Sequence, residues 1–358
     1  MTLNNINQIK RLDTDLKLAR SINALPEQIE HVLSELNSIK IPKNYAKINN
    51  IVINGMGGSN LGARIIKSVF ADQIKIPLNV EPGYEVPNYA DKNTLYLISS
   101  YSGNTEEPLD VYKEVKKRKC KIIGITSDDS KNKLKKLMQT DKIPGYIFNP
   151  KINPTNQPRM GVGYSIFGII SILSKINIIK INQTEIKQII KDLKKLNTTL
   201  DLDSLEQNNP AKQIAKKLYN KIPILVASEF LKGNVQTLRN QFSESSKNFI
   251  SYLTLPELNH YSMEGLSHPK SNQKNLIFFF FDSNLYHPRI QKRSELTKEV
   301  IKKNKILVID YKLKSKTKLA QSFEMLQIGS WITYYLGILN KINPVEVPWV
   351  NWFKKQLG

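Results

Sequence analysis

The sequence of 358 residues contains one cysteine and four histidines, and its densest apolar run, residues 276–281, is far too short to span a bilayer. The single cysteine, Cys120, cannot form an intramolecular disulfide, which fits a reducing compartment. No set of cysteines and histidines reaches the ligand count of a structural zinc site. The N-terminal segment has no apolar stretch that could act in a signal peptide. These absences predict a cytoplasmic protein without disulfides, structural zinc or membrane spans.

Acidic residues are scarce relative to basic ones: 31 Asp and Glu stand against 53 Lys and Arg, so the formal charge is +22. Such a charge is typical of nucleic-acid-binding proteins when the basic residues form one patch. Here the lysines are spread over many segments, such as 116–119 and 131–136, at helical spacing among apolar residues. That distribution is typical of solvated helix faces and argues against a nucleic-acid partner.

Length and hydrophobic pattern predict two α/β halves. The composition is that of a folded protein, and 358 residues suffice for about two domains. Apolar runs typical of buried strands alternate with helical spacing, at 51–54, 94–100, 120–127, 223–228, 275–283 and 305–312. The polar segment 180–212 predicts an exposed helix and a connecting loop. We therefore expect an N-terminal helical segment (1–45), a first domain with a parallel sheet (46–185) and a second domain that ends in helices (205–358).

A glycine-rich segment, residues 55–59, follows the first predicted strand. Glycine at the carboxyl end of a parallel strand lets backbone N–H groups approach an anion at a helix N-terminus. The spacing matches neither the G-x-G-x-x-G of dinucleotide loops nor the glycine-Lys-Ser/Thr of ATP loops. A plain tight turn is the alternative interpretation. The segment therefore implies neither a dinucleotide nor ATP.

The segment SYSGNT, residues 100–105, follows the next strongly predicted strand. Ser100, Ser102 and Thr105 place three hydroxyl groups around a glycine turn at the start of a predicted helix. Uncharged donors at a helix N-terminus suit a sugar phosphate. The alternative is a simple N-cap, with Thr105 capping the helix and two glutamates complementing its dipole, and both roles can coexist.

Five motifs in the same order, spread from about residue 50 to the C-terminus, resemble the bifunctional phosphoglucose/phosphomannose isomerase family. They are GMGGS at 55–59, SYSGNTEE at 100–107, QPR at 157–159, SESSK at 243–247, and ELNH followed by EG at 257–265. Five motifs in this order are far more specific than any one of them. The resemblance implies the SIS (sugar isomerase) fold: two α/β subdomains, each a flavodoxin-like parallel sheet flanked by helices, with further helices at both ends.

The resemblance also implies a phosphate site and catalytic residues. The substrate phosphate would be held by Gly58, Ser59, Ser100, Ser102 and Thr105. Glu244 of SESSK would move a proton between C2 and C1 of the open-chain sugar as a general base. Arg159 would stabilise the negative charge of a cis-enediolate, and His260 would assist opening of the cyclic sugar from the neighbouring subunit of a dimer. Lys354, with Lys355 one residue away, would lie near the sugar ring oxygen.

The resemblance thus predicts an isomerase that needs no metal or cofactor. It would interconvert glucose 6-phosphate and fructose 6-phosphate, and also mannose 6-phosphate and fructose 6-phosphate, as a homodimer. A non-catalytic SIS protein that senses a phosphosugar is the alternative, although residues 1–45 offer no convincing helix-turn-helix. A SIS amidotransferase is a third possibility, which lacks support because Met1-Thr2 provides no N-terminal cysteine nucleophile.

Overall fold

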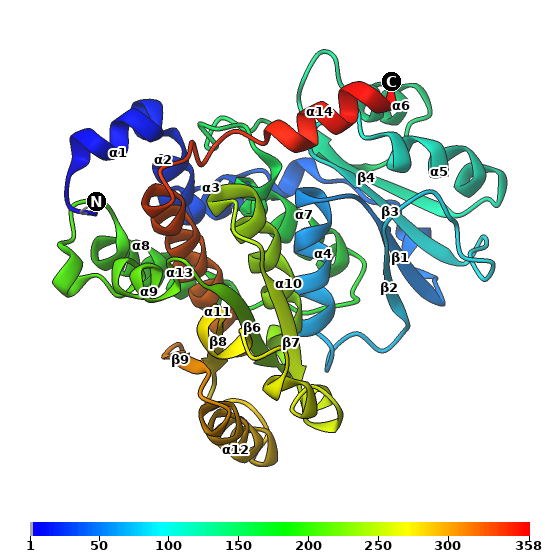
Figure 1. Ribbon diagram of the computed structural model, residues 1–358. Helices are drawn as coiled ribbons and strands as arrows, with labels where there is room; N and C mark the ends of the chain where they lie inside the picture. The colour runs from blue at the N-terminus through cyan, green and yellow to red at the C-terminus, as the bar shows by residue number, and fades with distance from the viewer. Residues whose placement is uncertain (1–2) are drawn as a thin grey trace.

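The computed structural model describes residues 3–358, and its strands form two parallel β-sheets flanked by helices (Figure 1). The first sheet has the order β2 (Leu78–Glu81), β1 (Asn50–Asn54), β3 (Thr94–Ser100), β4 (Lys121–Ser127), β5 (Gly145–Phe148). The second has the order β7 (Ser251–Leu255), β6 (Ile222–Ser228), β8 (Leu276–Asp282), β9 (Leu307–Lys312). Every strand pair is parallel. The predicted α/β class with two parallel sheets is confirmed.

The central strands are apolar because helices cover both faces of each sheet. All seven residues of β3 are buried, and in β8 the run from Ile277 to Phe281 is buried. Strands covered on both faces lose the alternation of polar and apolar residues that half-exposed strands have. This is why the strongest apolar runs of the sequence became the inner strands.

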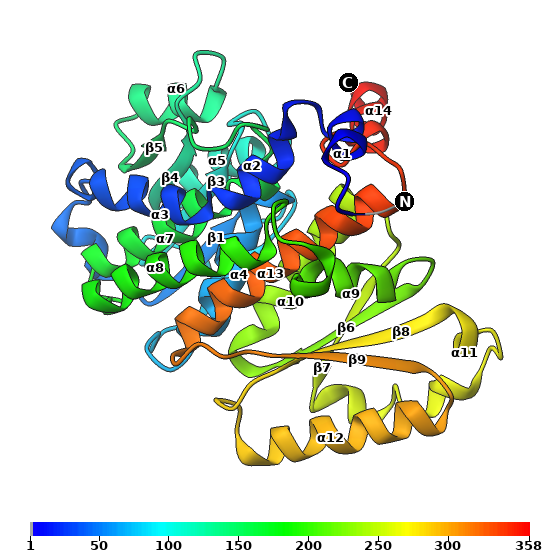
Figure 2. The same cartoon turned by 90° about the vertical axis from the view of Figure 1, so that its left-hand side faces the viewer.

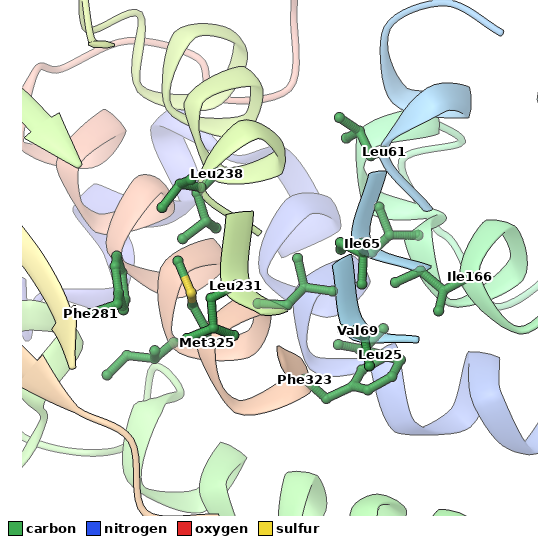
Figure 3. Packing of buried hydrophobic residues seen from close by; sticks show 14 of the residues in the cluster. Leu25, Leu61, Ile65, Val69, Ile166, Leu231, Leu238, Phe281, Phe323 and Met325 are labelled. Carbon is green, nitrogen blue, oxygen red and sulfur yellow. The ribbon is translucent and has the colours of Figure 1, made fainter. Parts of the chain in front are cut away.

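Four helices form the layer between the two sheets: α4 (Gly58–Val69), α7 (Val162–Lys175), α10 (Lys232–Gln241) and α13 (Lys318–Leu339). Their buried side chains belong to one hydrophobic cluster, which includes Leu61 and Ile65 of α4, Leu238 of α10 and Phe323 and Met325 of α13 (Figure 3). Helix α13 is buried from Gln321 to Leu339. The shared core joins the two halves into one packed unit.

Helices α4 and α10 cross closely and run in opposite directions. The Gly233 N–H donates to Ser68 Oγ at 3.0 Å, and Arg64 Nη1 donates to Gln236 Oε1 at 3.1 Å. A Cβ on Gly233 would lie 2.2 Å from the Arg64 carbonyl oxygen, so only glycine permits this approach. Since α4 follows β1 and α10 follows β6, the carboxyl ends of the two sheets face opposite ends of the molecule (Figure 1).

The remaining helices cover the outer faces and the ends of the chain. They are α1 (Ile6–Leu12), α2 (Lys17–Asn23), α3 (Leu25–Ser34), α5 (Glu106–Lys117), α6 (Lys133–Thr140), α8 (Gln183–Leu200), α9 (Pro210–Leu218), α11 (Asn272–Asn275), α12 (Pro288–Lys303) and α14 (Pro348–Leu357). None of the helices within residues 3–358 combines the length and apolar character that crossing a bilayer demands.

Helices α8 and α14 differ in how they pack. Helix α8, expected as an exposed helix, buries one face that includes Ile186 and Leu193, because its apolar residues recur at helical spacing. Helix α14, in contrast, has no buried residue, and Trp349 is 78% exposed. The domain limits at 46–185 and 205–358 stay a prediction.

Candidate active site

The loop between β1 and α4 is shaped by two glycines. Gly57 has a positive φ of 48°, which side chains disfavour. A Cβ on Gly58 would lie 2.7 Å from the backbone nitrogen of Arg159, so the segment around Arg159 packs directly on this loop. Ser59 lies in the first turn of α4, and its Oγ accepts a hydrogen bond from the Tyr101 N–H at 2.8 Å. The loop is therefore tied to the segment that follows β3.

The loop between β3 and α5 gathers the predicted hydroxyl groups. Ser100 Oγ donates to Thr105 Oγ1 at 3.0 Å, and Ser102 is exposed, its Oγ accepting from the Asn104 N–H at 3.3 Å. Thr105 occupies the N-cap position of α5, but its side chain makes no capping hydrogen bond. The simple capping alternative is therefore not seen. The first N–H groups of α5 stay free of a side-chain cap, and a helix N-terminus of this kind attracts anions.

Both loops lie at the point where the strand order of the first sheet reverses, between β1 and β3. Ligands of open parallel sheets bind at this point, outside the carboxyl ends of the strands. Besides the Tyr101 contact, Ser99 Oγ donates to the Ser59 carbonyl oxygen at 2.9 Å. The hydroxyls of Ser59, Ser102 and Thr105 thus come from adjacent loops, whereas the fully buried Ser100 orients Thr105.

Arg159 follows in the short helix η4 (Pro158–Met160) and its side chain is fully buried. Its five N–H groups donate to Ser245 Oγ (3.0 Å), Gln157 Oε1 (3.1 Å), Glu244 Oε2 (3.3 Å) and the carbonyl oxygens of Pro344 (3.0 Å) and Val345 (2.7 Å). Burial lowers the pKa of Arg159, and the neighbouring Glu244 carboxylate opposes that shift. The guanidinium is held rigidly in a dry position.

Glu244 lies in the π-helical turn η7 (Phe242–Ser246), which continues α10. π-helical turns are rare and frequently lie at functional sites, because the extra residue redirects side chains. The Glu244 side chain is 28% exposed, in contrast to the fully buried guanidinium with which it pairs. Gln241 Nε2 donates to the Arg159 carbonyl oxygen at 3.1 Å, so the end of α10 positions both members of the pair.

The predicted residues from the two halves of the chain thus meet at one place. Ser59 lies in α4, which contacts η4, and η4 carries the arginine paired with Glu244. Three further groups at the site, to which the sequence pattern gave no role, are Gln157, Ser245 and Lys247. All three lie inside the motifs QPR and SESSK, which was the available signal. The backbone carbonyls of Pro344 and Val345 had no signal in the sequence.

Neither His260 nor Lys354 contacts this pair within the described chain. His260 is exposed in η8 (Glu257–His260), after β7, at the carboxyl end of the second sheet, which faces away from the end of α10 that carries Glu244 (Figure 2). Lys354 is exposed on α14. Neither side chain forms a hydrogen bond or ion pair with another residue of the described chain, 3–358. The same described residues contain no cluster of three or more His, Cys, Asp or Glu side chains suited to a metal ion.

The two sheets, the reversal point between β1 and β3 and the hydroxyl loops define a SIS-domain protein, and residues 44–136 match the SIS domain model. Solved structures share the fold. A hypothetical protein of Thermus thermophilus has a TM-score of 0.75 at 16% identity, covering 98% of this chain and 93% of that one. Glucosamine-6-phosphate deaminase of Thermotoga maritima has a TM-score of 0.63 at 14% identity, with 96% and 97% covered.

Residues 207–357 match the model of the bacterial phospho-glucose isomerase C-terminal SIS domain. The bifunctional phosphoglucose/phosphomannose isomerase of Caldicellulosiruptor bescii is 30% identical over 343 residues, which cover 94% of this chain and 98% of the relative. That of Aquifex aeolicus is 28% identical, with 88% and 93% covered. The chain belongs to the bifunctional phosphoglucose/phosphomannose isomerase family. The resemblance stated from the motifs is confirmed.

Proposed function

We propose that this enzyme interconverts glucose 6-phosphate and fructose 6-phosphate, and mannose 6-phosphate and fructose 6-phosphate, through a cis-enediolate. The observation that carries the proposal is the Arg159–Glu244 pair, 3.3 Å apart, on a segment packed against the phosphate-type loop at Gly58. A carboxylate beside a buried cation can take a proton and have the resulting negative charge stabilised next to it.

The mechanism uses each group in turn. The hydroxyls of Ser59, Ser102 and Thr105 and the N-terminus of α5 would hold the phosphate. Glu244 would remove the proton from C2 of the open-chain aldose and return it to C1, while O2 loses a proton and O1 gains one. Arg159 would stabilise the enediolate oxygens. In the reverse direction, protonation of C2 from one face gives glucose 6-phosphate and from the other gives mannose 6-phosphate.

A coupled assay tests the proposal. Purified protein is given fructose 6-phosphate, with and without EDTA, and glucose 6-phosphate and mannose 6-phosphate are followed separately. We expect both products, at rates that EDTA leaves unchanged. Glucose 6-phosphate alone would restrict the specificity to one epimer. Neither product, together with retained binding of fructose 6-phosphate, would contradict the enzyme and favour the phosphosugar sensor.

A homodimer completes the proposed site. His260 is exposed after β7, at the carboxyl end of the second sheet, whereas Glu244 follows α10 at the opposite end of that sheet, so a role in opening the sugar ring requires that His260 enters the site of a second copy. Lys354 is proposed to reach the sugar ring oxygen from α14 of the same chain.

Complementation between two inactive variants tests the dimer. In a heterodimer of Glu244→Gln and His260→Asn subunits, one site carries both substitutions and the other carries neither. After unfolding and refolding of an equal mixture, about half of the dimers are heterodimers, and each heterodimer has one intact site of two. We therefore expect about a quarter of the wild-type activity. Each variant refolded alone serves as the control. No recovery above these controls would place His260 in its own chain's site or outside the reaction.

A further inference from the structure

The segment between α13 and α14 is held by two cations. We call residues 343–347 the strap. Four consecutive carbonyl oxygens of the strap accept hydrogen bonds: those of Pro344 and Val345 from Arg159 Nη2, and those of Asn343 (3.0 Å) and Glu346 (2.5 Å) from Lys247 Nζ. Within the strap, Asn343 Oδ1 accepts from the Val345 N–H at 2.8 Å. The turn thus directs its carbonyls toward the active site.

Lys247 connects the strap to the catalytic turn. It follows the π-helical turn directly, with a left-handed φ of 53°, and its Nζ also donates to the Glu244 carbonyl oxygen at 2.7 Å. An ammonium group has three N–H donors, and all three have a backbone acceptor here. One side chain therefore fixes the backbone of the proposed base relative to the strap.

The position of α14 depends on this attachment. No residue of α14 is buried, and its large side chains Trp349, Trp352 and Phe353 are exposed, so packing does not hold the helix in place. The strap is the covalent link that leads from the site to Lys354. Movement of the strap would therefore carry α14 with it.

The two cations are not equivalent anchors. Every N–H group of Arg159 already has a protein acceptor, so contact with a substrate oxygen requires that one of these bonds is exchanged. The bond exchanged is one to a strap carbonyl, because these acceptors are uncharged and belong to a segment that ends in an exposed helix. Lys247 would keep the strap attached while Arg159 exchanges a carbonyl for the substrate.

We propose that Lys247 is a positioning residue of the isomerase: it anchors the strap beside Glu244, and so places α14 and Lys354, while Arg159 transfers a hydrogen bond from the strap to the substrate. The catalytic part of this inference rests on the proposed function. The anchoring part does not, because it can be measured without substrate.

Protonation of Lys247 provides a second way to test the anchor. The groups that face it are Arg159, Glu244 and Glu346; burial and the Arg159 charge lower its pKa to about 8, against the opposing effect of the two carboxylates. Below this pH the ammonium supplies three donors. Above it the amine has only two, so at least one of the three carbonyls loses its partner. The strap should therefore loosen as the pH rises through about 8.

The experiment compares Lys247→Met with Lys247→Arg and with Lys341→Met. Lys341 lies two residues before the strap, and within residues 3–358 its side chain makes no hydrogen bond or ion pair. For Lys247→Met we expect hydrogen exchange of residues 343–357 about tenfold faster than wild type, and kcat/KM about 10- to 100-fold lower, because displaced groups lose their productive geometry. Lys247→Arg should recover most of both, and Lys341→Met should change neither.

Each outcome decides between the parts of the inference. Unchanged exchange in Lys247→Met would overturn the anchor, and faster exchange with unchanged kcat/KM would overturn its part in catalysis. Faster exchange in a protein that isomerises no hexose phosphate would instead contradict the proposed function while the anchor stands. Should Lys247→Met fail to fold, wild-type exchange decides: relative to α8, exchange of the strap must accelerate between pH 7 and 9, and a constant ratio would refute the anchor.

Discussion

Replacing Glu244 by glutamine is expected to lower kcat for fructose 6-phosphate by about 10³-fold with KM changed by less than about threefold. The amide retains the shape of the side chain and an oxygen that can accept from Arg159 Nη1, but it cannot take the proton from carbon. Substrate binding should persist because the phosphate loops lie on another segment. The measurement is steady-state kinetics of both epimers, since one base should serve both reactions.

Two controls separate loss of the base from loss of the fold. The variant leaves the buried Arg159 without its carboxylate partner, although its four neutral acceptors remain, so the free energy of unfolding should fall by only about 1–2 kcal/mol. Glu299→Gln on α12, where an exposed glutamate has no partner within the described chain, should keep full activity. Residual kcat above about a tenth of wild type in Glu244→Gln would assign the proton transfer to another group.

Arg159 is expected to show the second large effect. Arg159→Met removes the buried charge and should lower kcat by about 10²- to 10³-fold, because the enediolate oxygens lose their fixed counter-charge. It also leaves two strap carbonyls, Ser245 and Gln157 without their donor, which should lower the free energy of unfolding by about 3 kcal/mol.

Arg159→Lys separates charge from geometry. An ammonium on a shorter side chain keeps the charge but cannot reproduce the planar arrangement of donors, so we expect stability to recover partly while kcat stays at least about tenfold low. Thermal unfolding and hydrogen exchange of the strap should be measured on the same samples. A fully folded Arg159→Met with kcat within about threefold of wild type would remove Arg159 from the mechanism.

The strands and the two hydroxyl loops were accessible from sequence for a physical reason. Buried parallel strands need continuous apolar runs, and ligand-binding loops at their carboxyl ends need glycine and small hydroxyl residues. The sequence pattern alone therefore predicts β3 and the loop that follows it. The arginine and the glutamate were found only through motif resemblance. Nothing in the local pattern distinguishes a buried Arg159 from a surface arginine after proline.

What the sequence could not predict depends on backbone atoms and on distant contacts. The acceptors of Arg159 and Lys247 in the strap are carbonyl groups, which every residue has, so their role follows from the turn rather than from side-chain identity. Helix α8 is a different case: its polar composition predicted exposure, although the helical spacing of its apolar residues, which the sequence does show, decides that one face packs.

The antiparallel crossing of α4 and α10 gives the molecule an approximate internal twofold symmetry. The orders β2-β1-β3-β4 and β7-β6-β8-β9 are topologically equivalent, and the helix after the first strand of each half packs on its counterpart. The chain is thus arranged like two copies of one topology, of which only the first has a glycine-rich loop after its first strand; after β6 the corresponding residues read EFLK. His260 lies exposed at the carboxyl end of the second sheet, so in the proposed dimer the end that carries the phosphate-type loops in the first half would instead supply a side chain to the neighbour.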